Sequence, residues 1–101
     1  MITKEEYYLL KLFSKKWQKR YIIRNKNKSI NFFENKPIKD MYYGDWEASG
    51  MQNIVLGYYA TEWFSQVFKS ITWEDKEPKR IIDYIREYEQ WEEKNEENKK
   101  D

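Results

Sequence analysis

Apolar side chains recur at helical spacing near the start of the chain. They are Leu9, Leu10, Phe13 and Trp17. Spacings of three and four positions place such residues on one face of a helix. Thr3 precedes them, with Glu6 three residues later, and this pair fits a capping box in which each side chain accepts a hydrogen bond from the other residue's backbone amide. The pattern predicts a helix over residues 3–19.

A second apolar stripe near the C-terminus predicts another helix. It consists of Ile81, Ile85 and Tyr88, with Ile82 and Tyr84 beside them. Pro78 suits the first turn of this helix, where its missing N–H is no loss. Apolar residues stop after Glu92. We therefore expect one domain over residues 1–92 and a charged tail over residues 93–101, as a frayed helix or a disordered segment.

The middle of the chain is rich in β-forming residues separated by turn-prone ones. Residues 20–24 and 29–34 flank the polar stretch 25–28, which predicts a β-hairpin. Further strands are expected over residues 41–43, 53–56 and 70–74, and a short helix over residues 61–68. The pattern predicts an α+β fold, with a small antiparallel sheet of three to five strands between a basic first helix and an acidic last helix.

Charge divides the chain of 101 residues into two halves of opposite sign. Residues 1–39 carry eleven Lys and Arg and three Glu, a net charge of +8. Residues 40–101 carry eight Lys and Arg and fifteen Asp and Glu, a net charge of −7. Such halves either neutralise each other in the fold or present separate faces to charged partners. The many aromatic residues (5 Trp, 9 Tyr and 5 Phe) favour exposed rings beside this charge.

Several function classes are disfavoured by composition. The chain has no Cys, which excludes disulfides and thiolate chemistry, and no His, which removes the commonest general base and zinc ligand. Its three glycines lack the spacing of a phosphate-binding loop. No apolar run is long enough to span a membrane. We therefore expect a cytoplasmic binding protein without catalytic residues, cofactor or membrane contact.

The acidic C-terminal helix is the leading candidate for a partner-binding surface. Its proposed contact residues are Tyr84, Glu87, Tyr88, Trp91 and Glu92. Carboxylates along a helix can imitate a phosphate backbone, and Tyr and Trp are common anchors at the centre of an interface. The partner would be a host protein that binds nucleic acid or a nucleotide. The alternative is an ordinary amphipathic helix whose apolar stripe packs on the sheet.

The basic half offers a different candidate, a nucleic-acid-binding surface. The residues concerned are Lys15, Lys16, Lys19, Arg20, Arg24, Lys26 and Lys28. Lys and Arg contact phosphates, and the neighbouring rings can stack on bases. Because Lys lacks the fork that reads bases, such binding would be weakly sequence-selective. The alternative is a solvated basic face with the rings in the core.

Carboxylates in the second half raise the question of a metal ion. Glu74, Asp75 and Glu77 are close in sequence, with Asp40, Asp45 and Glu47 elsewhere. Oxygen ligands suit magnesium or calcium, but the spacing does not match a calcium loop. Helix capping and solubility explain Asp75 and Glu77, so no metal site is expected from the sequence.

Three segments and one Trp resemble short accessory proteins of phages and prophages of low-GC, Gram-positive bacteria. They are YIIRNKNK at residues 21–28, NKP at 35–37, Trp46 and WEDKEP at 73–78. Such proteins often bind a host defence effector, imitate its nucleic acid or sequester a nucleotide. The resemblance implies an inhibitor of a host defence protein in the bacterial cytoplasm. A direct nucleic-acid-binding protein remains the alternative.

Overall fold

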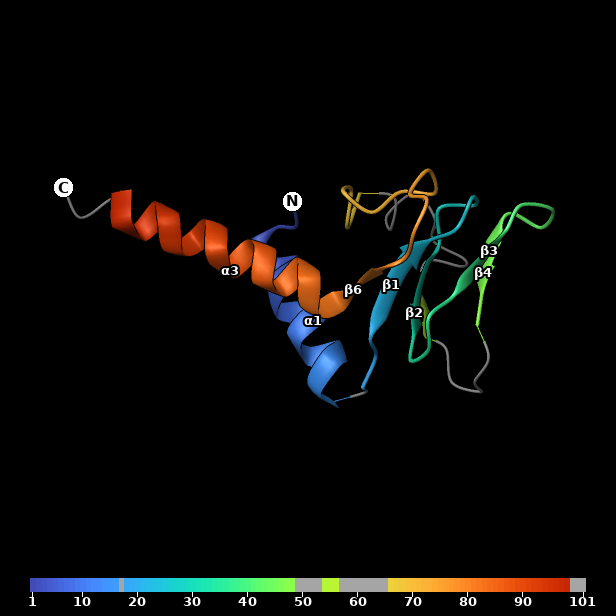
Figure 1. Cartoon of the computed structure of the whole chain (residues 1–101), viewed down its shortest axis with the longest axis horizontal. Coiled ribbons are helices and arrows are strands. Elements are labelled where there is room, and N and C mark those ends of the chain that lie inside the picture. Colours follow the sequence, from blue (N-terminus) through green and yellow to red (C-terminus); the bar gives the residue numbers. More distant parts are fainter. Residues whose placement is uncertain (17, 49–53, 57–65, 99–101) are drawn as a thin grey trace.

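The computed structural model describes residues 1–16, 18–48, 54–56 and 66–98. Its elements are α1 (Lys4–Lys16), β1 (Tyr21–Arg24), β2 (Ile30–Phe33), β3 (Ile38–Asp40), β4 (Asp45–Glu47), β5 (Ile54–Leu56), β6 (Lys79–Arg80) and α3 (Ile81–Asn98). The helices cover one face of the main sheet, and the β3–β4 hairpin lies on its other side (Figure 1). The predicted α+β class is confirmed.

The main sheet is antiparallel, with strand order β5-β2-β1-β6. Its centre is the hairpin predicted from the sequence, in which Tyr21 pairs with Phe33 and Arg24 with Ile30. The backbone amide of Asn25 donates to the carbonyl of Ser29 at 2.9 Å, which closes the turn. β5 confirms the strand expected near residues 53–56.

Alternation along β1 and β2 sends side chains into two separate cores. Ile22 and Phe32 face α1 and α3, where the Phe32 ring stacks on Phe13 at 4.0 Å between centroids. Ile23 and Phe33 face the β3–β4 hairpin and pack on Trp46. Both faces of the sheet are therefore covered by apolar contacts, which explains why the two strands are buried almost throughout.

α1 begins as predicted and ends earlier than predicted. The Thr3 amide donates to Glu6 at 3.0 Å and the Glu6 amide donates to Thr3 at 3.2 Å, so the capping box is confirmed. The helix ends at Lys16. Gln18 has a left-handed backbone, with φ of 54°, which a continuing helix does not allow. Lys19, expected in the helix, lies after it.

Two strands expected in the middle of the chain are turns. Residues 41–44 form the tight turn of the β3–β4 hairpin, because the Asp40 carboxylate accepts from the amides of Tyr42 and Tyr43. Residues 70–74 contain turns and no strand. Of the helix expected over residues 61–68, residues 61–65 lie outside the described residues and residues 66–68 are turn and bend.

α3 begins three residues after Pro78, not at it, because Lys79 and Arg80 first pair with β1 as strand β6. The helix then continues to Asn98, through most of the expected tail. Only its first half packs on α1, and its second half extends beyond the body (Figure 1). This extension gives the molecule its long axis of 53 Å, against 26 and 23 Å in the other directions.

Candidate interaction surfaces

The first half of α3 is part of the core. Tyr84 and Tyr88 are both buried, and Tyr88 is only 4% exposed. The Tyr88 ring stacks on Tyr7 of α1 with 4.6 Å between centroids. The Tyr7 hydroxyl donates to Glu89 Oε2 at 2.9 Å, and burial, followed by this carboxylate, raises the pKa of Tyr7. Tyr84 and Tyr88 therefore position the helix and have little surface to offer a partner.

The second half of α3 carries the exposed part of the predicted partner-binding set. Trp91 is 46% exposed and lies 5.7 Å from the Tyr88 ring. Glu92 follows it and is half-buried, whereas the exposed Glu87 forms an ion pair with Lys79. Of the five predicted contact residues, Trp91 and Glu92 thus lie on the projecting helix, and Glu87 lies on its base.

The predicted nucleic-acid-binding residues do not form one surface. Lys15 and Lys16 occupy the last turn of α1, and Arg20 follows just before β1. Lys26 and Lys28 lie in the turn at the opposite end of β1. The four residues of β1 separate the two groups by roughly 13 Å along the strand.

Two members of the basic set are buried and bonded within the chain. Lys19 is 3% exposed and forms an ion pair with Glu34 at 3.4 Å. The Arg24 guanidinium donates to the carbonyls of Ile71 at 2.8 Å, Lys28 at 2.6 Å and Phe68 at 3.1 Å. Burial lowers the pKa of Arg24. Arg24 thus holds the segment around Phe68 against the hairpin.

Lys26 and Lys28 belong to a hollow that sequence reasoning did not identify. Its volume is about 430 Å³, and its lining includes Lys69, Thr72 and Trp73. Lys26, Lys28 and Lys69 are all exposed, and the Trp73 ring is half-buried. Lys69 is more than forty positions away in the sequence, so no local pattern connects it to the hairpin turn. The hollow combines cations with an aromatic ring, the two features that phosphate contact and base stacking use.

The tip of the β3–β4 hairpin is the most exposed apolar surface of the described residues. Tyr42 is 87% and Tyr43 73% exposed, and Met41 is similarly open. Gly44 supports this turn with a φ of 72°, a left-handed backbone that favours glycine. Sequence reasoning placed residues 41–43 in a strand, although Asp40 and Gly44 on either side are turn residues.

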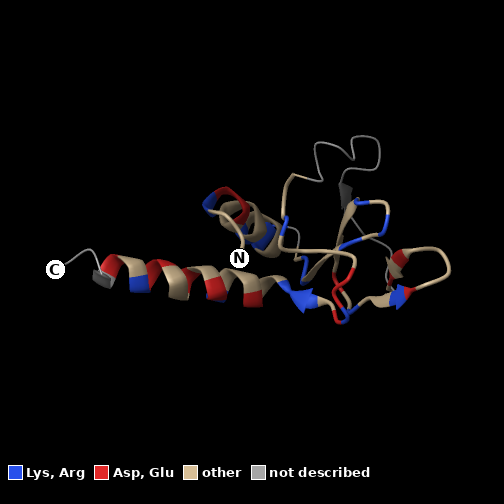
Figure 2. Ribbon diagram, turned by 90° about the horizontal axis from the view of Figure 1, so that it is seen from above, with Lys and Arg blue, Asp and Glu red and all other residues tan. Residues whose placement is uncertain are grey.

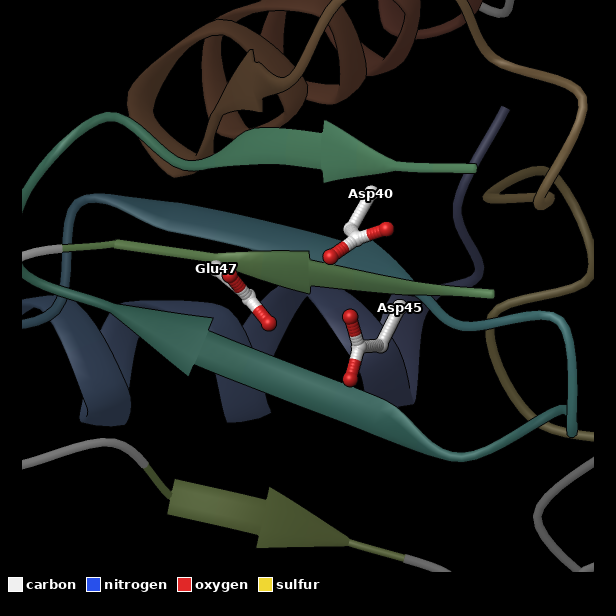
Figure 3. A group of neighbouring side chains, drawn as sticks. All are labelled: Asp40, Asp45 and Glu47. Atoms are coloured by element: carbon white, nitrogen blue, oxygen red, sulfur yellow. The ribbon is translucent and has the colours of Figure 1, made fainter. Parts of the chain in front are cut away.

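Three carboxylates gather on the same hairpin. Asp40 pairs directly opposite Asp45, and Glu47 lies two residues further along β4. One oxygen from each lies within 4.8 Å of the others (Figure 3). The carboxylates considered with them in the sequence have local roles: Asp75 accepts from the Thr72 amide and hydroxyl, and Glu77 forms an ion pair with Lys36.

The two charged halves stay largely separate. Of the ion pairs between described residues, only Lys36–Glu77 joins residues 1–39 to residues 40–101. α1 and α3 meet through rings and the Tyr7–Glu89 hydrogen bond, not through a zipper of opposite charges. Acidic residues recur along α3 where it extends from the body (Figure 2).

Neither described helix has the length and apolar character needed to cross a membrane. None of the protein-family models, curated proteins or solved structures compared with the chain matches it.

Proposed function

We propose that this chain is a non-enzymatic accessory protein of a phage or prophage, which inhibits a host defence protein in the bacterial cytoplasm. It would cover the basic site at which that protein binds nucleic acid or a nucleotide. The observation that carries the proposal is the half-exposed Trp91 on the projecting half of α3. An indole is a strong interface anchor, and surrounding carboxylates complement a basic rim.

Charge repulsion along the projecting helix supports a basic partner. Glu89 and Glu93 are four residues apart, as are Glu92 and Glu96, and like charges at this spacing destabilise a helix. The last turn of α3 contains no basic residue to complement the helix dipole. A cationic surface would offset both effects, so contact with a basic partner would stabilise the helix.

The test is capture of the partner by immobilised protein from lysates of strains that carry nucleic-acid-dependent defence systems. A supporting result is one defence protein that is retained by the wild type and released by an excess of its own nucleic acid or nucleotide. Trp91→Ala and Glu92→Lys should each lose it. Glu74→Lys is the matched control, because it makes the same charge change at an exposed position outside the helix.

The outcomes separate this proposal from non-specific attraction. Equal loss of capture in Glu92→Lys and Glu74→Lys would show that the net charge of the protein alone explains the interaction. Retention of the partner by Trp91→Ala would contradict a site centred on the indole. Failure to inhibit the captured protein's activity would contradict the role as an inhibitor.

The hollow around Trp73 favours a second candidate, direct and weakly sequence-selective binding of nucleic acid. Lys26, Lys28 and Lys69 would contact phosphates beside the Trp73 ring. Fluorescence anisotropy with a labelled single-stranded oligonucleotide would test this in a salt series. Three phosphate contacts predict a slope of log affinity against log salt of roughly −2.

Alanine at these three lysines should abolish the oligonucleotide binding. The matched control is alanine at Lys15 and Lys16, which are also exposed but lie at the other end of β1. Equal effects of the two sets of substitutions would point to diffuse attraction, and binding without salt dependence would contradict this candidate.

A further inference from the structure

The acidic group of the β3–β4 hairpin consists of Asp40, Asp45 and Glu47. Asp40 and Asp45 are direct partners across the two strands, and like charges in this position weaken strand pairing. Among the described residues, no Lys or Arg lies within ion-pair distance of Asp40, Asp45 or Glu47. Lys39 on the same hairpin instead lies over the Trp73 ring and donates to the Trp73 carbonyl. The described residues therefore provide no ion pair that offsets this repulsion.

A second observation lies beside these carboxylates, on β2. Asn31 is only 9% exposed, and its side-chain oxygen Oδ1 has no hydrogen-bond partner. Asp45 Oδ1 is likewise shielded from solvent and without a partner. A buried acceptor without a donor is costly, and a native protein seldom keeps one without a ligand, water or functional reason.

The two residues that carry these oxygens line the same hollow. Asn31 and Asp45 both line a space of about 500 Å³ between β2 and the base of the hairpin turn at Gly44. Asn31 shares its face of β2 with Phe33, which packs on Trp46 of β4, so this face is turned toward the hairpin. Asp45 is thus a member both of this hollow and of the acidic group.

We propose that Asp40, Asp45 and Glu47 bind a hard divalent cation, with Asn31 contributing its amide oxygen from β2. Ca²⁺ is the expected ion, because it takes six to eight carboxylate and amide oxygens at about 2.3–2.6 Å in a flexible geometry. One oxygen of each carboxylate lies within 4.8 Å of the other two, so a single cation can contact all three. Mg²⁺ is less suited, because it requires a near-ideal octahedron and usually keeps several waters.

The cation would act on the shape of the hairpin. Asp40 ends β3 and Asp45 begins β4, so a shared cation joins the two strands immediately before and after the turn. This turn carries the exposed rings of Tyr42 and Tyr43. Binding would replace repulsion at the base of the turn with a cross-link and hold the aromatic tip in one orientation.

Terbium luminescence is the direct test, because Tb³⁺ occupies calcium sites and Trp46 lies between Asp45 and Glu47 in the chain. Excitation of the indole should sensitise Tb³⁺ emission, and added Ca²⁺ should displace it. In parallel, the thermal unfolding midpoint should rise in Ca²⁺ relative to Na⁺ at equal ionic strength and to a chelator.

Asp45→Asn gives a signature that a merely structural residue would not give. It should lower the Ca²⁺ affinity by at least about tenfold. In chelator, however, its unfolding midpoint should be higher than that of the wild type, because the repulsion with Asp40 is gone. Glu93→Gln on α3 is the matched control, with the same loss of charge at an exposed position, and should titrate like the wild type.

The proposal would be overturned by the absence of Ca²⁺-displaceable Tb³⁺ emission. It would also be overturned if Asp45→Asn bound Ca²⁺ as tightly as the wild type, or if Glu93→Gln lost as much affinity as Asp45→Asn. The last result would show that Ca²⁺ only screens acidic side chains in general.

Discussion

The hydroxyl of Tyr7 donates a hydrogen bond of 2.9 Å to Glu89 Oε2. This bond joins α1 to the middle of α3, whose second half extends beyond the body of the protein (Figure 1). Tyr7→Phe keeps the ring that stacks on Tyr88 and removes only the donor. The free energy of unfolding should fall by about 1 kcal/mol in urea titrations. Tyr8→Phe, at an exposed neighbouring ring, should leave it unchanged, and equal effects would contradict a specific role for the bond.

Tyr88 and Trp91 are three residues apart on α3 and should respond oppositely to alanine. Tyr88 is buried against Tyr7, so Tyr88→Ala opens a cavity and should cost about 3 kcal/mol or more. Trp91 is half-exposed, and Trp91→Ala should cost less than about 1 kcal/mol. Chemical denaturation measures both. A large loss at Trp91 would show that its ring serves the fold and would remove it as a surface-only probe of binding.

Local patterns in the sequence predict the parts of this fold that rest on local interactions. The Thr3–Glu6 capping box and the alternating strands of the β1–β2 hairpin depend on residues close in sequence. The conformation of the turns is harder to predict from the sequence. Tyr42 and Tyr43 have high β propensity, yet the neighbouring Asp40 carboxylate accepts from their backbone amides, and this contact decides the conformation.

The candidate sites are harder still to predict from the sequence, because they depend on contacts between segments far apart in the chain. The burial of Arg24 follows from the carbonyls of Phe68 and Ile71, more than forty residues away. Lys69 reaches the hollow near Lys26 for the same reason. Composition and charge indicated exposed rings beside an acidic helix, but only the packing of α1 distinguishes the exposed Trp91 from the buried tyrosines of the same helix.

Arg24 should be irreplaceable even by another cation. Its guanidinium donates to the carbonyls of Ile71, Phe68 and Lys28, the first two in buried bonds, whereas a lysine ammonium cannot span them. Arg24→Lys should lower the free energy of unfolding by about 2–3 kcal/mol in denaturant titrations, because carbonyls lose charge-assisted donors. Arg20→Lys, at an exposed position, provides the control and should be neutral. Wild-type stability in Arg24→Lys would show that the carbonyls find other donors.

Alkaline pH should unfold the protein partly through Tyr84. Burial, and then the charges of Asp75 and Glu87, raise the pKa of Tyr84 well above its usual value of 10.0. Below about pH 10 this phenol is protonated in both states, so its contribution to stability is fully present. Above that pH the unfolded chain releases the proton first, and the free energy of unfolding falls as pH rises toward the folded pKa.

Tyr84→Phe isolates this contribution. Urea unfolding of the variant and the wild type at several pH values between about 8 and 12 should give equal slopes of stability against pH at the lower end, and a difference that grows toward one proton above about pH 10. An unchanged slope would mean that Tyr84 ionises equally in both states, in contradiction to its buried position.

Substitutions that reverse acidic charges on the projecting helix should raise its stability and weaken its binding to the partner. Glu93→Lys and Glu96→Lys together convert the like-charge pairs with Glu89 and Glu92 into attractive pairs four residues apart. They also place cations near the C-terminal end of the helix dipole, so the double variant should be more helical by circular dichroism and more stable by about 1 kcal/mol. Glu74→Lys should show neither change. A gain of stability together with loss of the captured partner would indicate that the repulsion is kept for binding a basic surface, whereas a less stable variant would show that Glu93 and Glu96 make favourable contacts within the chain.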